Sequence, residues 1–423
     1  MLTLSTLLPL LPLLASSVGA VHLSDGRYEK VSRVLEGISR YSWENGTKAQ
    51  AILESQYPSL SVFSPTDPLP LPSPLPSGDI SQIIDIAQTT LQNRENSSAA
   101  SRNGGLGLVP DAAAADPASL GVAVLLANAS TGNAQVNGVG YGDAATAQLN
   151  YLLYDVPRTP DGAISHRANQ PQLWADFVYM VPPFLAYYGV LNNNQTLVQE
   201  AVKQIQLYRQ TLRTDTGLWA HILLGNGTHD PGLWATGNAW AAAGMLRVLA
   251  TIKWSDFAGS MDTEMNNLRD WTTEILSASK GVVSSGNMLH NYLNDSSTFE
   301  DSSATALMAA AALRLSTLNL TNDYVPFGVD MLSAVSAKVN GTGYVTQVVN
   351  PYDFTQQGAE SAEAQSFVLM AYAAYNEWDK MGQPGNTAKG DPLGKDSGAV
   401  RPSWSLGAIV VAGLAAGGGW LIL

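Results

Sequence analysis

The stretch Gln172-Leu-Trp-Ala-Asp-Phe-Val-Tyr-Met180 sets one carboxylate among apolar and aromatic side chains. Spacings of three and four residues predict that Asp176 shares one helix face with Gln172, Tyr179 and Met180. An ionised carboxylate in an apolar setting is costly unless it is paired or its pKa rises, and a raised pKa suits a general acid working near neutral pH. The spacing leaves two interpretations equally open, a general acid and a hydrogen-bonded structural Asp.

Helical periodicity continues on both sides of this stretch, broken by Gly, Asn and Pro, and strand-like alternation is scarce. Helices are predicted over residues 25–41, 47–56, 79–94, 117–128, 142–154, 170–190, 195–213, 237–252, 262–279, 300–316, 325–338 and 360–380. The helix over 170–190 should kink at Pro182-Pro183. Successive helices without strands must pack on one another, and a closed double ring would bury many apolar faces in one domain. No fixed repeat period is evident, which counts against a regular α-solenoid.

The amino-terminal segment, residues 1–20, is apolar and ends in small residues, which predicts a signal peptide cleaved after Ala20. We expect one helical domain over 21–380. Sequons of the type Asn-x-Ser/Thr, which accept N-linked glycans in secreted chains, fit this export. They are Asn45, Asn96, Asn128, Asn194, Asn226, Asn294, Asn319 and Asn340.

The carboxyl-terminal segment, residues 406–423, is apolar and carries no charge, and it follows a polar linker over 381–405 that contains Ser397-Gly-Ala. Small residues, a polar spacer and an apolar tail form the pattern for a glycosylphosphatidylinositol (GPI) anchor. We expect attachment at Ser397, with Asn386 and Gly394 as other candidates, and an extracellular protein bound to the membrane or wall. The alternative is a plain transmembrane helix, although no Lys or Arg follows the apolar run.

The composition argues against several kinds of partner. The net charge is −13 with 22 Lys and Arg, and a nucleic-acid partner needs a cationic surface. The chain has 5 His without ligand spacing and no Cys, so we expect no metal site. No phosphate-binding Gly motif is present, so we expect no cofactor. A long polyanion would be repelled at long range, which favours short fragments held by local groups.

Three motifs together resemble glycoside hydrolase family 105, the unsaturated rhamnogalacturonyl hydrolases. They are the Trp-x-Asp-x-x-Tyr-Met block, Gly217-Leu-Trp-Ala-His221, and Trp234-Ala-Thr-Gly-Asn-Ala-Trp240. The resemblance runs from about residue 116 to residue 378 and extends to the run around Glu363. It implies an (α/α)6 barrel of the six-hairpin glycosidase type. It also implies a reaction in which an acid protonates C4 of a C4=C5 double bond, water adds at C5, and the neighbouring sugar is released.

The resemblance also implies roles for particular residues. Asp176 would be the acid and base, and Asp116 would be a second catalytic Asp, although its place before a helix also fits an ordinary N-cap. The implied substrate-binding residues are His166, Arg167, Trp174, His221 and Trp240. A lone His is more often structural, and an Arg more often solvated.

One departure bears on substrate preference. Members of the family commonly have Arg-Gly-x-Gly-Trp where this chain has Thr236-Gly-Asn-Ala-Trp240, so a cation that would help to hold the substrate is missing. Losing an ionic contact to a carboxylate commonly costs about 1.5–3 kcal/mol. Two alternatives to the hydrolase therefore remain. One is a catalytically silent wall protein that binds carbohydrate, and the other is an anchored mannan-processing enzyme, whose adjacent paired aspartates this chain lacks.

Overall fold

The computed structural model describes residues 25–65, 69–71, 75, 80–94 and 102–386. The predicted signal peptide, the apolar carboxyl-terminal segment, Ser397, Gly394 and the sequon at Asn96 lie outside the described residues. Within the described part of the chain, no helix is both long and apolar enough to cross a membrane.

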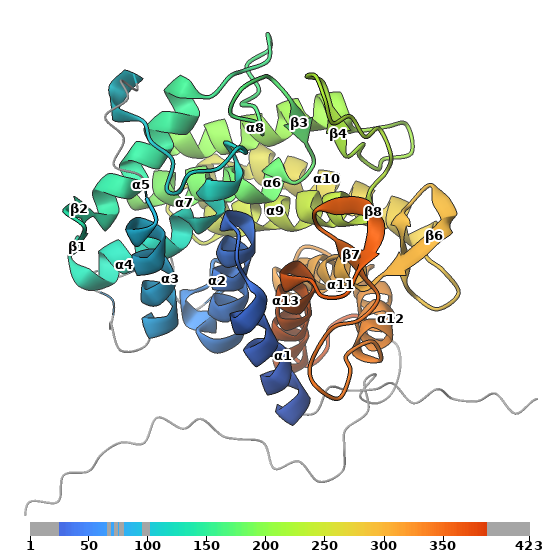
Figure 1. Ribbon diagram of the computed structural model, residues 1–423. Helices are drawn as coiled ribbons and strands as arrows, with labels where there is room; N and C mark the ends of the chain where they lie inside the picture. Colours follow the sequence, from blue (N-terminus) through green and yellow to red (C-terminus); the bar gives the residue numbers. More distant parts are fainter. Residues whose placement is uncertain (1–24, 66–68, 72–74, 76–79, 95–101, 387–423) are drawn as a thin grey trace, which may run out of the picture.

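The helices form two concentric rings (Figure 1). The inner ring consists of α2 (Ser42–Gln56), α4 (Gly121–Thr131), α7 (Pro182–Leu191), α9 (Ala235–Lys253), α11 (Ser302–Thr317) and α13 (Ala362–Lys380). The outer ring consists of α1 (Asp25–Ile38), α3 (Ser81–Gln92), α5 (Tyr141–Asn150), α8 (Gln195–Leu212), α10 (Asp262–Lys280) and α12 (Val325–Ser336). Because α13 packs against α2, the inner ring closes, and the predicted (α/α)6 barrel is confirmed in place of an open solenoid.

The sequence of each helix explains its ring. Every residue of α9 from Ala235 to Ile252 is buried, and the helix is rich in Ala and Gly, so neighbouring backbones can approach from all sides. Gly244 illustrates this fit, since a Cβ there would lie 2.2 Å from the carbonyl oxygen of Val178. Outer helix α10 instead buries only a stripe that begins with Leu268 and Thr272. An amphipathic helix of this kind covers the inner ring and faces water.

A network of buried charges holds the inner helices together. Arg247 on α9 and Arg314 on α11 both donate to the carboxylate of Glu54 on α2, and Arg314 also pairs with Glu377 on α13. The centroid of the Phe63 ring lies 5.4 Å from the central carbon of the Arg247 guanidinium and 4.3 Å from that of Arg314. Charges this deeply buried are tolerated only when paired, so the network ties four inner elements into one arrangement.

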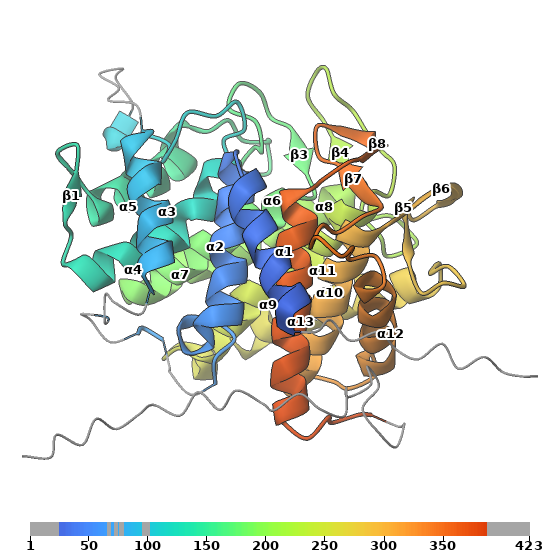
Figure 2. The same ribbon diagram turned by 60° about the horizontal axis from the view of Figure 1, so that its bottom comes forward.

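Short two-stranded antiparallel sheets connect the helices, and all except the first gather at the end of the barrel where the inner helices begin (Figure 2). Each sheet has two strands: β1 (Gln135–Val136) with β2 (Val139–Gly140), β3 (Leu173–Trp174) with β4 (Ile222–Leu223), β5 (Leu289–Tyr292) with β6 (Asp295–Asp301), and β7 (Val348–Asn350) with β8 (Asp353–Gly358). Strands β4, β6 and β8 precede α9, α11 and α13 in the chain. The three sheets from β3 to β8 therefore place loop side chains over the amino-terminal ends of the inner ring.

The segment around Asp176 differs from its predicted helix. Residues 173 and 174 form β3, which pairs Trp174 with Ile222, and the helical part is split into α6 (Phe177–Met180) and α7, which begins at Pro182. Proline has no N–H to continue the preceding helix and is favoured in a first turn, so the expected break occurs here. Asp176 is the residue before α6, and the prediction that it shares a helix face with Gln172 was wrong.

The other predicted helices are present with shifted ends. Helix α2 begins at Ser42 rather than residue 47, because Glu44 accepts from the backbone N–H of Arg40 and Tyr41 and thereby caps an earlier start. Gly46 is accommodated inside this helix, where a Cβ would collide with Ser119. The helix predicted over 117–128 begins with a 3₁₀ segment, η4 (Asp116–Leu120), and only then continues as α4.

Candidate active site

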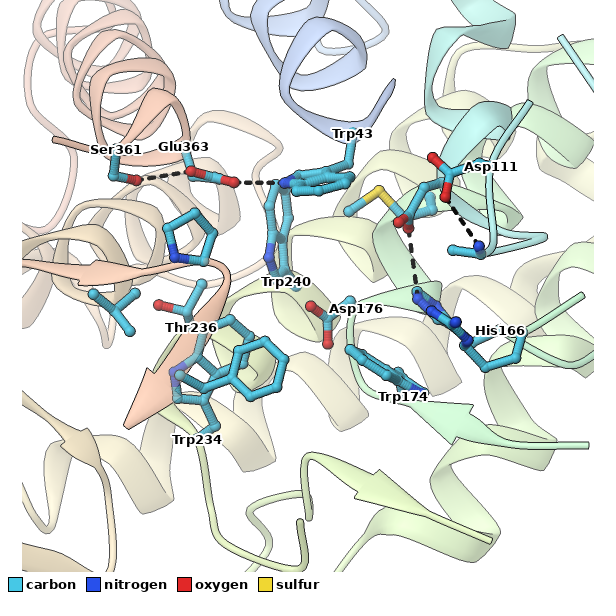
Figure 3. A pocket seen from close by; sticks show the side chains of 17 residues that line it. Trp43, Asp111, His166, Trp174, Asp176, Trp234, Thr236, Trp240, Ser361 and Glu363 are labelled. Atoms are coloured by element: carbon cyan, nitrogen blue, oxygen red, sulfur yellow. Dashed lines mark hydrogen bonds and ion pairs between the residues drawn. The ribbon is translucent and has the colours of Figure 1, made fainter. Parts of the chain in front are cut away.

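A cavity of about 170 Å³ opens among the hairpins at the amino-terminal ends of the inner helices. Its walls combine carboxyl groups with aromatic rings from segments far apart in the sequence (Figure 3). Of the residues predicted from the sequence, Asp116, His166, Arg167, Trp174, Asp176 and Trp240 all line it. His221 does not line the cavity but lies directly behind Asp176.

Asp176 and His221 face each other without a regular hydrogen bond. The distance from Asp176 Oδ2 to His221 Nε2 is 3.5 Å, and both atoms are buried without another partner among the described residues. His221 is completely buried, and its other ring nitrogen lies 2.9 Å from Asp230 Oδ2. Two buried polar atoms this close, both short of a partner, can share one proton.

Asp230 fixes the ring of His221 from the far side. It accepts hydrogen bonds from the Tyr292 hydroxyl at 2.7 Å and from the Gly232 N–H at 2.9 Å. Burial favours a raised pKa for Asp230, but the contacts with His221, Tyr292 and Gly232 outweigh it and lower the pKa below its ordinary value. An ionised Asp230 therefore holds Nδ1 of His221 protonated and turns Nε2 toward Asp176.

The charge of His221 follows from the same contacts. Burial disfavours the imidazolium and would lower the pKa, yet the facing carboxylates of Asp176 and Asp230 together raise the pKa of His221 above its ordinary value. Of the contacting residues His221 and Asp230, the sequence pointed only to His221, which belongs to a quoted motif. Asp230 was missed, because it lies on the loop after β4 and no spacing links it to the other site residues.

Asp116 and His166 form a second pair on the opposite side of Asp176. Their nearest side-chain atoms, Oδ1 and Nε2, lie 3.6 Å apart, and both side chains are almost fully buried. Burial, reinforced by the charges of Asp111 and Asp176, raises the pKa of Asp116 well above its usual range. Burial lowers the pKa of His166 to about 3. These shifts favour a protonated Asp116 carboxyl and an uncharged His166 imidazole. Asp116 is not an N-cap, because Ala115 holds that position.

Aromatic rings shape the space in front of Asp176. Trp174 stacks on His166 with centroids 4.7 Å apart, and its indole N–H donates to Gln172 Oε1 at 2.9 Å. Phe354 approaches Trp174 edge-on at 5.8 Å and contacts Trp234 at 5.3 Å. Faces and edges of this kind are the surfaces on which sugar rings stack.

Trp240 lies deeper in the cavity. It is buried and packs against Tyr179 and Phe367, so it forms part of the floor (Figure 3). Trp219, the Trp of the quoted Gly217–His221 motif, is completely buried and does not line the cavity.

Glu363 is a site residue for which sequence reasoning gave no role. It is buried at the start of α13, where it accepts from the indole N–H of Trp43 at 2.5 Å and from the Ser361 hydroxyl at 2.8 Å (Figure 3). Burial, with the charge of Glu44, raises the pKa of Glu363 to about 7. The residue stands in a run quoted for the family resemblance, but only the fold brings it to Trp43, 320 positions earlier.

Thr236 occupies the position of the missing family Arg. Its hydroxyl donates to Asp301 Oδ2 at 2.8 Å, and the same carboxylate caps α11 by accepting from the N–H groups of Ser303 and Ala304. Burial raises the pKa of Asp301, although these hydrogen bonds oppose the change. The substitution thus removes a cation from the cavity wall and leaves a buried, hydrogen-bonded Thr.

The cavity carries one cationic side chain among its described lining residues, Arg167, whose guanidinium carbon lies 6.0 Å from the Trp174 ring. No group of three or more His, Asp or Glu within the described ranges could hold a metal ion.

The described sequons lie on loops and helix ends. Five of their Asn residues are exposed, namely Asn194, Asn226, Asn294, Asn319 and Asn340, while Asn45 and Asn128 are half-buried.

An (α/α)6 barrel with acidic and aromatic residues at this end defines a glycoside hydrolase of the six-hairpin type. The chain belongs to Glycosyl Hydrolase Family 88, whose family model matches residues 131–367. The sequence matches no curated protein.

Solved structures share the fold at low sequence identity. A possible member of the GH105 family from Salmonella enterica has 17% identity and a TM-score of 0.64, and the match covers 83% of this chain and 92% of that chain. A glycosyl hydrolase family 88 protein from Bacteroides vulgatus has 14% identity and a TM-score of 0.62, with coverage of 83% and 97%. An unsaturated glucuronyl hydrolase from Bacillus sp. GL1 has 13% identity and a TM-score of 0.53, with coverage of 82% and 93%.

Proposed function

We propose that the protein hydrolyses oligosaccharides that end in an unsaturated uronyl group, by hydrating the C4=C5 double bond of that group. The observation that carries the proposal is the facing pair of Asp176 Oδ2 and His221 Nε2, at 3.5 Å and without other partners, behind a cavity lined by Trp174. Membership of family 88 supports it, as does the similar Bacillus protein, which is an unsaturated glucuronyl hydrolase responsible for glycosaminoglycan degradation. A rhamnogalacturonyl-type substrate is the version that we favour, on the motif resemblance and the similar GH105-type structure.

The proposed reaction consumes one water and no cofactor. Asp176 delivers a proton to C4, and the positive charge that develops at C5 is shared with the ring oxygen. Water then adds to C5 and returns its proton to Asp176, which acts as general base. The resulting hemiketal opens by breaking the bond between C5 and the ring oxygen, which leaves a ketone at C5. The hemiacetal so formed at C1 releases the neighbouring sugar as an alcohol.

The surrounding residues would support each step. His221, held by Asp230, supplies or accepts the proton that Asp176 exchanges with the substrate. Trp174 would stack on the sugar ring. His166 Nδ1 is buried without a partner among the described residues and is available to a sugar hydroxyl. Burial raises the pKa of Asp116, which favours its protonated form and a hydrogen bond donated to the substrate.

A deuterium experiment tests this proposal. In D2O, hydration places one deuterium at C4 of the released product, which proton NMR of a sample quenched early in the reaction detects. Ordinary cleavage of the glycosidic bond would leave the double bond in the product and no deuterium at C4. That second pattern, or the absence of any product, would overturn the proposed reaction and leave carbohydrate binding as the remaining role.

We further propose that the protein is exported, glycosylated and anchored at the cell surface through GPI, as in the fungal anchored type. The support is the pattern of residues 1–20 and 406–423, together with sequons on the surface of the described structure. Release of the protein from intact cells by a phosphatidylinositol-specific phospholipase tests the anchor. Protein that stays with the membrane after complete enzyme treatment would indicate a transmembrane helix instead.

A further inference from the structure

The wall of the cavity around Thr236 offers no cation and little hydrogen-bonding capacity to an anion. Four other residues that line the cavity, Trp234, Val349, Pro351 and Phe354, are apolar or aromatic. Figure 3 shows Thr236 and Trp234 on the side of the cavity that also holds Ser361 and Glu363, across from His166.

The hydrogen-bond donors of this wall are already committed. The hydroxyl hydrogen of Thr236 points to Asp301, and the indole N–H of Trp234 donates to Asn291 Oδ1 at 3.1 Å. The N–H of Val349 donates to Asp301 Oδ1 at 3.0 Å. Asp301 itself is completely buried behind this wall. A carboxylate placed here would meet an acidic residue behind the wall and lose water without gaining donors in return.

The rest of the cavity does not supply the missing charge. Its lining includes Asp111 and Asp176, together with Asp116 and Glu363, two buried acids whose pKa is raised, and Arg167 is the one cation among the described lining residues. Arg167 follows His166 and lies beside Trp174, so it is on the other side of the cavity from Thr236. A carboxylate on the Thr236 side would therefore lose water without gaining a cationic partner among the described lining residues.

We infer that the cavity accepts an unsaturated uronyl group whose carboxyl is uncharged, namely a methyl ester, in preference to the free carboxylate. This inference rests on the proposed function and specifies its substrate. Its basis is the wall at Thr236, whose hydrogen-bond donors are committed to other groups and which has no cation beside it among the described lining residues. The ester methyl group would pack against Val349, Pro351 and Phe354, where burial of apolar surface is favourable.

Chemistry explains why the uncharged form would be an ester. A C4=C5 double bond arises when a lyase removes the proton at C5 and expels the group at C4, and a carbonyl at C6 makes that proton acidic. The neutral form of such a sugar therefore keeps the carbonyl and masks only its charge. The reaction that supplies the substrate would be β-elimination on a methyl-esterified polyuronate, and its short products also fit the acidity of the whole chain, which disfavours long polyanions.

Binding to a protein that cannot turn over the ligand tests the inference separately from catalysis. Asp176→Asn would be titrated calorimetrically with a methyl-esterified unsaturated uronyl disaccharide and with its saponified form at the same pH and ionic strength. We expect the ester to bind at least about tenfold more tightly, the difference that one unfavourable ionic contact commonly makes. The substitution removes one negative charge from the cavity, so it biases the comparison against this result.

Two outcomes overturn the inference: the free acid binds as tightly as the ester, or neither form binds to folded protein. Turnover by the wild-type protein is measured in parallel. If the ester binds preferentially but the wild-type protein hydrates neither compound, the recognition stands and the proposed function fails.

Added charge on the wall provides a second readout. Pro351→Arg places a cation at the half-buried rim of the wall, where the chain can accommodate it more readily than at the buried Thr236. In the Asp176→Asn background it should shift the ratio of affinities toward the free acid by at least about tenfold. Gln356→Arg adds the same charge to the exposed part of β8, outside the cavity, and should leave the ratio unchanged. Equal shifts in both variants would contradict local recognition at the Thr236 wall.

Discussion

Replacing Asp230 by Asn tests whether the charge behind His221 controls the site. His221 Nδ1 and Asp230 Oδ2 lie 2.9 Å apart, and the imidazole is fully buried. A hydrogen bond between charged groups contributes about 1.5–3 kcal/mol, which corresponds to about one to two pKa units. We therefore expect the pKa of His221 to fall in Asp230→Asn, because the contact with Asp230 is one of the causes that raise it.

The same loss should appear in catalysis. If the imidazolium supports proton exchange by Asp176, kcat/KM for an unsaturated uronyl disaccharide should fall by about ten- to a hundredfold, since each 1.36 kcal/mol is tenfold in rate. NMR titration of the His ring protons gives the pKa, with the His221 signal identified by its absence in His221→Gln. Asp323→Asn, an exposed Asp outside the cavity, is the matched control.

The pH dependence of stability has a defined sign. The pKa of His221 is raised, so its contribution is fully present below its unfolded value near 6.5 and is lost as pH rises through the raised folded value. The pKa of Asp230 is lowered, so its contribution is present above its unfolded value and is lost as pH falls through the folded one. The difference in unfolding free energy between the wild type and Asp230→Asn should therefore be largest at pH values between the unfolded pKa of Asp230 and the unfolded pKa of His221. An unchanged His221 pKa together with an unchanged rate would refute the reasoning.

Two further predictions concern stability. Glu54→Ala should lower the free energy of unfolding by about 3–5 kcal/mol, because two buried Arg lose their shared partner. Denaturant titration measures this change. A decrease no larger than the one caused by replacing an exposed Glu with Ala would contradict the role of the network. Glu363 holds its proton up to about pH 7 in the folded state, because burial raises its pKa from the ordinary value of 4.5 to about 7, so its stabilisation is lost as pH rises through about 7. Between pH 4.5 and about 7 the free energy of unfolding of the wild type should fall by about 3 kcal/mol relative to that of Glu363→Gln. If the unfolding free energies of the two proteins change in parallel with pH, the pKa of Glu363 is not raised.

The fold was largely predictable because the two rings leave different marks on the sequence. Outer helices such as α8 and α10 show amphipathic stripes, and inner helices such as α9 and α11 show continuous small apolar residues. Both patterns come from local periodicity. The exception was the segment around Trp174, where pairing with β4 overrides helical spacing, and a distant strand leaves no local signal.

The candidate site was predictable where a motif carries several of its residues. Asp176, Trp174 and His221 lie in quoted motifs, and the structure brings them together, although their roles remain predictions. Asp230 and Glu363 were not assigned roles because their importance comes from burial and from partners distant in the sequence. Burial and long-range pairing, which also set the pKa values in the cavity, follow from the closed ring rather than from spacing.

The most direct test of the central claim is the ultraviolet absorbance of the conjugated C4=C5 double bond. Lyase-generated uronyl disaccharides, both methyl-esterified and free, would be incubated with the wild-type protein and with Asp176→Asn after both are shown to be folded. Hydration at the site predicts that the wild type removes the absorbance of at least one disaccharide and that Asp176→Asn removes none. Unchanged absorbance with every disaccharide, or equal loss with Asp176→Asn, would contradict it.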